Sequence, residues 1–432
     1  MKPNRIALAC ALAFGAGSAF AQEAGTPVTA ASSVQLYGHL DLSYDVITKG
    51  IAGKTDAAGN TAMGKLGWQD DISSNLSYVG LRGSRDLGST GLKAVFQFET
   101  QIDVAASPGG STVPDNTVKG ALVSRNSFLG LAGEWGAFKL GKTDAPYKLS
   151  TARMDPFSAT IGDYNSIMGN TGGDNRAEFD TRFSHAMWYE SPNMNGFRVS
   201  ALYAPGQNRS SDNSATASGE PNCTGGNQPP CTDGSFGNAY SVAGTYEIGP
   251  MYVIAAYERH VNVNRTGDDA SGGGPAPAGA VGMANEQAFK AGIQYSMRST
   301  VLNFIVERMT RAAPDPSFNE RQRNGFWLAA TQKLSSNDDV NLGLAHAGKT
   351  PGDPGTGPID NASNMLALGY KHHFDRQTNW YAAYARQQNH TGAHYDLGAS
   401  GHGITTDCKD ATGECFPGGK LQGISVGMQY NF

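Results

Sequence analysis

The sequence has few charged residues and, beyond a short stretch at its N-terminus, no long apolar segment. No later stretch approaches the ~18 consecutive apolar residues that a membrane-spanning helix requires. Charged residues make up 16% of the 432 residues, and the formal net charge is −5. No cluster of basic residues is interleaved with aromatics, as nucleic-acid binding would require. The composition therefore excludes a helical membrane protein and predicts no nucleic-acid partner.

Signs of catalysis and of metal binding are also missing. The His-Glu-x-x-His pattern of zinc hydrolases does not occur. His372 and His373 are adjacent, and neighbours on a strand point to opposite faces, so they are not expected to share a metal ion. Heptads and repeated blocks of fixed period are absent as well. We expect a protein that is not an enzyme and that has no cofactor.

The N-terminus has the composition of a cleavable secretory signal. Lys2 and Arg5 precede an apolar run over residues 6–20, and alanines stand at the first and third positions before Gln22. We therefore expect residues 1–21 to be removed and residues 22–432 to form a single domain. A lipoprotein signal ending at Cys10 is the alternative, but only four apolar residues precede that cysteine.

From residue 34 onward, apolar and polar residues alternate in stretches of about ten residues. This is the period of a strand with two unlike faces. It is clear over residues 92–99, 197–203 and 240–248, and clearest over residues 424–432. Three stretches, residues 251–260, 301–309 and 380–386, carry apolar residues on both faces and are candidates for subunit contact.

The lengths of the connections distinguish a membrane barrel from a soluble sandwich. Short links alternate with long segments rich in Gly, Asp, Asn and Pro. The long segments are residues 45–75, 103–120, 143–178, 206–236, 262–284, 311–323, 349–361 and 390–420. Eight long and seven short connections predict an all-β, sixteen-stranded antiparallel transmembrane barrel with short periplasmic turns and long extracellular loops. Such a ring must close, because hydrocarbon offers an open edge no hydrogen-bond partner, and it is wide enough to hold water.

Aromatic residues near the predicted strand ends are typical of the girdles at the two membrane interfaces. Seven of them are Tyr37, Tyr44, Trp188, Tyr203, Tyr257, Trp327 and Trp380. Met428, Tyr430 and Phe432 alternate with small or polar residues up to a final aromatic. That pattern resembles the signal read by the barrel assembly machinery of the outer membrane.

The chain also resembles the Gram-negative general porins of the β-proteobacterial type. The resemblance rests on residues 33–38 (SVQLYG), on residues 79–88 (VGLRGSRDLG) and on residues 91–94 (GLKA), with further matches in order along the mature chain. It implies a homotrimer in the outer membrane, with lipid and lipopolysaccharide around it and a third loop folded into the lumen. Ions and small hydrophilic solutes would diffuse through. A substrate-specific channel and an occluded adhesin or structural barrel are the alternatives.

Charge placement predicts where this lumen narrows. If Leu81 faces lipid, then its neighbours in the strand, Tyr78 and Arg82, face the lumen. The resemblance adds Arg125 and Arg182 to the lumen wall and assigns Phe157 to anchor the third loop. Within residues 143–178, three aspartates are available, and some are expected to oppose the arginines and set up a transverse field. They are Asp144, Asp155 and Asp163.

Each of these assignments has a structural alternative. An arginine can pair with a neighbouring carboxylate. A loop aspartate can be a turn residue only, with its side chain bonded to the backbone of the loop. Tyr78 stands where anion-selective relatives carry an arginine, so the resemblance does not predict the ion preference.

Four cysteines remain after removal of the signal. Proximity pairs Cys223 with Cys231 and Cys408 with Cys415, in two of the predicted external loops. Secreted proteins meet an oxidising environment, so we expect two local disulfides, although four cysteines allow three connectivities. A metal site is the alternative, but few suitable ligands lie nearby.

Overall fold

The computed structural model describes residues 33–432, with gaps at residues 57, 65, 106–122, 170–178, 206–236, 264–283, 312–321, 350–359, 394, 398–407, 409 and 413. The expected signal segment, residues 1–21, lies outside the described residues. Among those described, no helix is long and apolar enough to cross a membrane.

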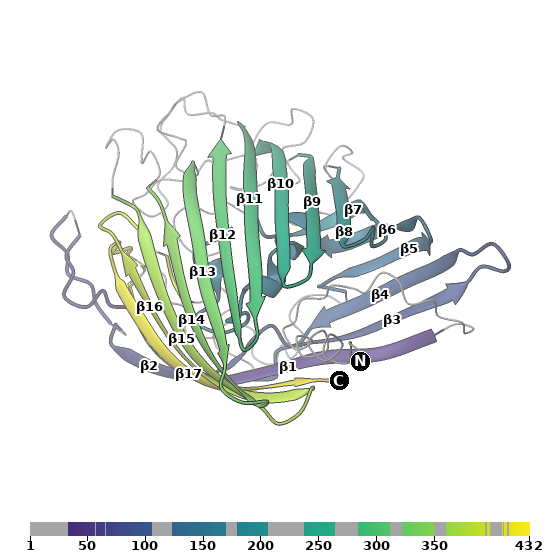
Figure 1. Ribbon diagram of the computed structural model, residues 1–432. Coiled ribbons are helices and arrows are strands. Elements are labelled where there is room, and N and C mark those ends of the chain that lie inside the picture. The colour runs from purple at the N-terminus through teal and green to yellow at the C-terminus, as the bar shows by residue number, and fades with distance from the viewer. Residues whose placement is uncertain are drawn as a thin grey trace.

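Strand segments form a single antiparallel sheet that closes into a barrel (Figure 1). They are β1 (Ser33–Thr48), β2 (Trp68–Ser74), β3 (Tyr78–Asp86), β4 (Lys93–Gln101), β5 (Ser127–Gly133), β6 (Gly136–Asp144), β7 (Arg182–Glu190), β8 (Phe197–Ala204), β9 (Ala239–Ile248), β10 (Met251–Val263), β11 (Ala284–Met297), β12 (Thr300–Arg311), β13 (Arg323–Lys333), β14 (Asp338–Ala347), β15 (Ser363–His373), β16 (Thr378–Asn389) and β17 (Lys420–Asn431). The last strand, β17, pairs with β1. Both β2 and β3 pair with β1, at its two halves, so together they occupy one position in the ring. The predicted sixteen-stranded barrel is confirmed.

The second position in the ring is interrupted between β2 and β3. Leu76 has a φ of 54°, and the Asn75 side chain donates hydrogen bonds to Asp41 and Ser43 of β1. The long connection predicted over residues 45–75 is wrong at both ends, because β1 continues to residue 48 and residues 68–74 form β2. A turn made by such tertiary contacts leaves no mark in the alternation of the sequence.

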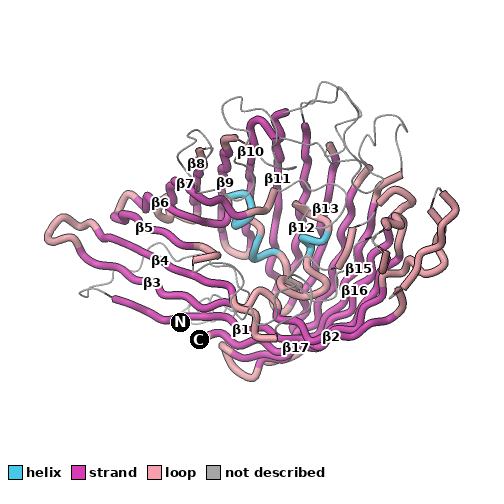
Figure 2. The backbone as a smooth tube through the Cα atoms, turned by 180° about the vertical axis from the view of Figure 1, so that it is seen from behind, coloured by secondary structure: helices cyan, strands magenta, loops and turns pink. Residues whose placement is uncertain are grey.

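The two ends of the barrel differ in the length of their connections, as predicted. At one end the links are short, for example Gly249-Pro250 between β9 and β10. At the other end the connections are long, and we call residues 145–181, between β6 and β7, loop 3. Its described part contains α1 (Pro146–Leu149), η1 (Ala152–Met154) and η2 (Tyr164–Ser166). These short helices lie inside the barrel, so loop 3 folds into the lumen (Figure 2).

Apolar residues occupy both faces of several strands because loop 3 covers the inner one. Ile254 of β10, Ile305 of β12 and Tyr381 of β16 are buried in the same cluster as Phe157 and Ile161 of loop 3. The apolar pattern that made these strands candidates for subunit contact is therefore explained by packing inside the barrel.

The aromatic residues predicted for the girdles fall into two groups. Four of them lie on the outer face, because the residues before and after each one along its strand are buried and face inward. These four are Tyr44, Tyr203, Tyr257 and Trp380. The other three, Tyr37, Trp188 and Trp327, are buried inside the barrel at 3%, 4% and 0% exposure. The girdle prediction is wrong for these three, because a nearby strand end does not determine which face a side chain takes.

Candidate pore constriction

Phe157 packs loop 3 against the barrel wall. Its ring meets the Trp327 ring edge to face, with 6.2 Å between the centroids. Gly343 of β14 and Gly369 of β15 leave room for it, because a Cβ on either residue would lie 2.9 Å from a Phe157 ring carbon. The Trp327 indole N–H also donates to the Met154 carbonyl at 3.2 Å. This packing agrees with the anchoring role expected for Phe157.

Buried polar groups hold the two ends of loop 3. Near its start, the Tyr147 hydroxyl donates to Glu307 Oε2 of β12 at 2.8 Å. Further along the loop, the Gly169 N–H donates to the other oxygen of the same carboxylate at 3.1 Å. Near its end, Asp180 forms an ion pair with Lys290 of β11, and neither side chain is exposed. No sequence motif marks this set of groups, so it could not be predicted from the sequence.

Arg82 lies on the inner face of β3. Leu36 and Leu81 are paired across β1 and β3 and are 59% and 44% exposed on the outer face. Their neighbours Gln35 and Arg82 therefore face inward. Arg82 Nε donates to Gln35 Oε1 at 3.0 Å, and its guanidinium lies 4.7 Å from the centroid of the Tyr37 ring. Within the described part of the chain, no carboxylate forms an ion pair with Arg82.

Arg125 precedes β5 and is joined to the same wall by a carboxylate and an aromatic ring. Its Nε donates to Glu99 Oε1 at 2.6 Å, and Glu99 Oε2 accepts from the Tyr37 hydroxyl at 3.0 Å. The guanidinium carbon of Arg125 lies 4.6 Å from the centroid of the Tyr78 ring. Tyr78 is only 3% exposed, so its ring supports Arg125 rather than lining open water.

Arg182 begins β7 and contacts one of the three predicted aspartates. Its Nη2 donates to Asp144 Oδ2 at 3.0 Å, and its Nε donates to Asn126 Oδ1 at 2.7 Å. Lys148 of loop 3 donates to the other Asp144 oxygen at 3.0 Å. Two cations therefore share one carboxylate, and this corner of the wall keeps a net positive charge.

Asp155 and Asp163 are placed differently from the expectation. Asp155 accepts from the backbone N–H groups of Phe157 and Tyr164, and Asp163 accepts from those of Ala159 and Asn165. Burial raises the pKa of Asp155 well above its ordinary value, and the neighbouring charge of Asp163 raises it further. The structure does not bring either aspartate to the wall arginines. Both shape the turn of loop 3, because their oxygens are used by its backbone.

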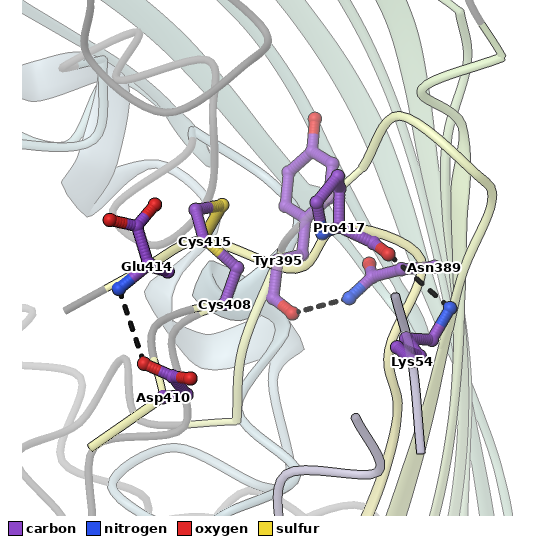
Figure 3. Close-up of a disulfide and its surroundings, with 8 residues drawn as sticks. All are labelled: Lys54, Asn389, Tyr395, Cys408, Asp410, Glu414, Cys415 and Pro417. Carbon is purple, nitrogen blue, oxygen red and sulfur yellow. Dashed lines mark hydrogen bonds between the residues drawn. A yellow bond between two sulfur atoms is a disulfide. The ribbon is translucent and has the colours of Figure 1, made fainter. Parts of the chain in front are cut away.

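Cys408 and Cys415 form a disulfide in the connection between β16 and β17 (Figure 3). Asp410, inside this disulfide loop, accepts from the Met63 N–H of the connection between β1 and β2 at 2.9 Å. The Ala411 N–H donates to the Met63 carbonyl at 3.0 Å. The bridge therefore braces a contact between two external connections. The other predicted pair, Cys223 and Cys231, lies outside the described residues.

Phe432 lies at the seam where β17 meets β1. Its N–H donates to the Gly38 carbonyl at 3.1 Å, and the Gly38 N–H donates to the Phe432 carbonyl at 3.0 Å. Its ring stacks on Tyr430 with 5.8 Å between centroids, and both rings lie on the outer face with Met428. These three residues thus form an apolar outward row next to the closing hydrogen bonds.

Two stretches have the residue spacing of enzyme motifs but lie within strands. Residues 136–143 match the Gly-x-x-x-x-Gly-Lys-Thr pattern of phosphate-binding loops, and residues 423–427 match Gly-x-Ser-x-Gly. The first chemistry needs a loop before a helix, and the second needs a turn between strand and helix. Here the two stretches run along β6 and β17, and Ser425 is fully buried. Neither geometry is present.

A closed sixteen-stranded barrel with an inward third loop and a basic inner wall defines the class of outer-membrane channel proteins. The chain matches the Gram-negative porin family over residues 7–392. It belongs to that family, which places it in the outer membrane of a Gram-negative bacterium.

Individual relatives agree with this assignment. The chain is 26% identical to outer membrane porin protein 32 of Delftia acidovorans over the full length of both. It is 31% identical to the major outer membrane protein P.IA of Neisseria meningitidis over 43% of this chain, and that match spans only 45% of the relative. Among solved structures, an anion-selective porin from Comamonas acidovorans has a similar fold, with a TM-score of 0.66 and 21% identity over 93% of this chain and all of the other.

Proposed function

We propose that the protein is a passive diffusion channel for ions and small hydrophilic solutes. Loop 3 packs on the inner wall from β7 to β17, because its Tyr147 and Phe179 are buried in one cluster with residues of β7 to β12 and its Phe157 and Ile161 in another with residues of β10 to β17. We infer that the wall from β3 to β6, together with the start of β7, faces the remaining lumen. This one observation carries the proposal, because the narrowest passage is then expected between the loop and the three wall arginines. Family membership supports a transport role without catalysis and without a cofactor.

The neck is expected to favour anions weakly. Arg82 has a neutral amide as its hydrogen-bond partner, and Arg182 and Lys148 share one carboxylate. Arg125 is balanced by Glu99, so only part of the positive charge is offset. Tyr78 contributes no charge of its own, but it supports the Arg125 guanidinium. A positive wall raises the local concentration of passing anions.

The functional unit is proposed to be a homotrimer. The outer face from β1 to β6 is apolar, as a subunit contact or a lipid contact requires; its exposed side chains include Leu36, Leu81, Phe98, Leu129, Leu131, Phe138 and Leu140. The family resemblance supports three copies. Cleavage after Ala21 and insertion by the barrel assembly machinery, aided by the outward row of Met428, Tyr430 and Phe432, complete the proposed route to the membrane.

Planar-bilayer recording of the purified protein tests the proposal. A water-filled trimer should give large conductance steps in groups of three. In a salt gradient, the reversal potential should have the sign expected of a channel that prefers anions. A current that saturates with one particular solute would favour a substrate-specific channel on the same barrel. The absence of conductance would contradict every channel assignment and favour an occluded barrel.

A further inference from the structure

Tyr37 of β1 reaches across β3 to Glu99 of β4 on the inner face of the barrel. In the strand register, Tyr37 is paired with Gly80 of β3, and Gly80 is paired in turn with Glu99. The Tyr37 hydroxyl donates to Glu99 Oε2 at 3.0 Å. Neighbouring strands lie about 4.8 Å apart, so this contact spans two strand spacings. The strand between the two residues must therefore leave its inner face open.

Gly80 provides that open space. A Cβ added at this position would lie 2.5 Å from Tyr37 Cζ and 2.7 Å from the Tyr37 hydroxyl oxygen. Both separations are too short for unbonded atoms, because protein interiors are already close-packed. A side chain at position 80 would displace the Tyr37 ring and separate its hydroxyl from Glu99.

Two arginines of the inner wall depend on Tyr37. The guanidinium carbon of Arg82 lies 4.7 Å from the centroid of the Tyr37 ring, a cation–π contact. Arg125 is reached through Glu99, whose Oε1 accepts from Arg125 Nε at 2.6 Å. The rings of Tyr37 and Tyr78 also meet edge to face, with 6.2 Å between centroids, and Arg125 lies over the Tyr78 ring. One uncharged residue is thus in contact with the supports of both cations.

The terminal amino groups of Arg82 and Arg125 remain available to the lumen. Each arginine uses its Nε for a hydrogen bond, Arg82 to Gln35 and Arg125 to Glu99. Among the residues that the structure describes, none accepts a hydrogen bond from Nη1 or Nη2 of either arginine. Arg182 differs, because one of its terminal amino groups is already bonded to a carboxylate. Arg82 and Arg125 therefore keep more free donors for a passing anion.

The Tyr37 hydroxyl also limits how much of the Arg125 charge is offset by Glu99. Glu99 is 2% exposed, and a buried carboxylate requires hydrogen bonds to its oxygens. Tyr37 supplies the close one to Oε2, since the other donor, Gln97 Nε2, is 3.5 Å away. Without the hydroxyl, Oε2 would be drawn to the free amino groups of Arg125, in the two-bond pairing that arginine and carboxylate favour. Those amino groups would then no longer be available to the lumen.

We propose that Tyr37 is a positioning residue for ion preference, and that the space left by Gly80 allows it to act. Tyr37 holds the Arg82 guanidinium against its ring and holds Glu99 by its hydroxyl, so that the terminal amino groups of Arg82 and Arg125 stay free. The inference rests on the proposed channel function and extends it to a residue that carries no charge. The alternative is that the buried Tyr37 serves packing alone.

The test measures reversal potentials in a salt gradient for variants of the full-length protein in planar bilayers. Tyr37→Phe removes only the hydroxyl, Tyr37→Leu removes the ring as well, and Gly80→Ala pushes an intact Tyr37 away from Glu99. The matched control is Tyr44→Phe. It removes a hydroxyl that donates to Asp70 at 3.0 Å on the outer face of the same strand.

We expect Tyr37→Phe to shift the reversal potential toward cation selectivity, by less than Arg125→Ala does, because Arg125 keeps its charge. Tyr37→Leu should shift it further, since Arg82 then loses the ring beneath it. Gly80→Ala should behave like Tyr37→Phe, and Tyr44→Phe should behave like the wild type. A wild-type potential in Tyr37→Phe, or an equal shift in the control, would overturn the proposal. Because Tyr37→Phe keeps the ring, this result does not depend on the variants that disturb packing.

A second measurement separates positioning from packing. Glu99→Gln removes the charge of the carboxylate, so in that background the Tyr37 hydroxyl has no anionic oxygen to restrain. Adding Tyr37→Phe to Glu99→Gln should then cause no further shift of the reversal potential. A shift of the same size in both backgrounds would assign Tyr37 to packing and overturn the proposal. Such a failure would leave the channel function intact, because conduction by the wild type and the three arginine variants test that function separately.

Discussion

Asp180, at the end of loop 3, is ion-paired with Lys290 of β11, and both side chains are fully buried inside the barrel. The Lys290 ammonium also lies 4.0 Å from the centroid of the Tyr147 ring and 3.3 Å from the Thr151 hydroxyl. One lysine thus contacts residues from both ends of loop 3. Together with Glu307, it fixes the loop against the wall that it covers.

Removing the lysine should release loop 3. Lys290→Met would leave the Asp180 carboxylate buried without its cation, at a cost of about 3–5 kcal/mol. Hydrogen exchange over residues 147–169 should speed up, and single-channel current should become noisier. The double variant Lys290→Met with Asp180→Asn removes both charges and should recover part of the loss, which a double-mutant cycle measures. Unchanged exchange in the single variant would show that the pair does not hold the loop.

The same pair predicts a pH dependence of stability. Burial raises the pKa of Asp180 from its ordinary value of 3.8 to about 6, although Lys290 lowers it. Because the folded-state pKa is the higher one, folding takes up a proton between about pH 4 and pH 6. The stability contributed by this group is complete below about pH 4 and is lost as the pH rises through 6, on the order of 3 kcal/mol in total.

Thermal unfolding in detergent between about pH 4 and pH 7 measures this effect. Asp180→Asn should flatten the corresponding part of the stability curve. The exposed Asp86→Asn, at the rim, is the matched control and should leave the curve as it is. A curve with the same slope in the Asp180 variant would refute the assignment.

The disulfide should protect a local contact and leave the barrel as a whole unaffected. Replacing Cys408 and Cys415 by serine frees a short loop, and such a bridge is worth on the order of 2 kcal/mol to the segment that it closes. We expect faster hydrogen exchange at Ala411, whose N–H donates to Met63, with unchanged global unfolding. The double serine variant can be compared with reduced wild type as a control. Equal exchange in oxidised and reduced protein would argue against the bracing role.

Phe432 should matter for assembly more than for conduction. Its backbone closes the seam with Gly38, and its ring completes the outward row with Tyr430. Phe432→Ala keeps the backbone bonds but removes the ring, so the yield of folded trimer in the membrane should fall severalfold. Phe432→Tyr keeps an aromatic ring and serves as the control. Normal yields of the alanine variant would refute an assembly role for this side chain.

The barrel could be predicted from the sequence because its two signals are local. Alternation reports which face of a strand is apolar, and connection length separates the two ends of the barrel. The break between β2 and β3 could not be predicted, because Asn75 is held by side chains of β1 that lie 32 and 34 positions away in the chain. The burial of the Trp327 side chain inside the barrel likewise depends on its packing against loop 3. The alternation of apolar and polar residues does not predict that packing.

The candidate constriction was predictable only in part, for a similar reason. The inward direction of Arg82 follows from the period of its strand. The roles of the three aspartates do not, since Asp144 meets Arg182 whereas Asp155 and Asp163 bind the backbone of their own loop. The Lys290 and Asp180 pair joins β11 to the end of loop 3, and its members are 110 positions apart. Such pairs are visible only once the chain is folded.

The reversal potential in a salt gradient tests the basic wall most directly. Each of Arg82→Ala, Arg125→Ala and Arg182→Ala removes a cation from the wall, within about one Debye length, roughly 10 Å at 0.1 M salt, of a passing ion. We predict that the reversal potential of each variant shifts toward cation selectivity. The shift should be largest for Arg125→Ala, because the buried Glu99 then lacks its partner. Arg308→Ala, on the outer face, is the matched control and should not shift the potential. Unchanged reversal potentials in all three wall variants would contradict the account.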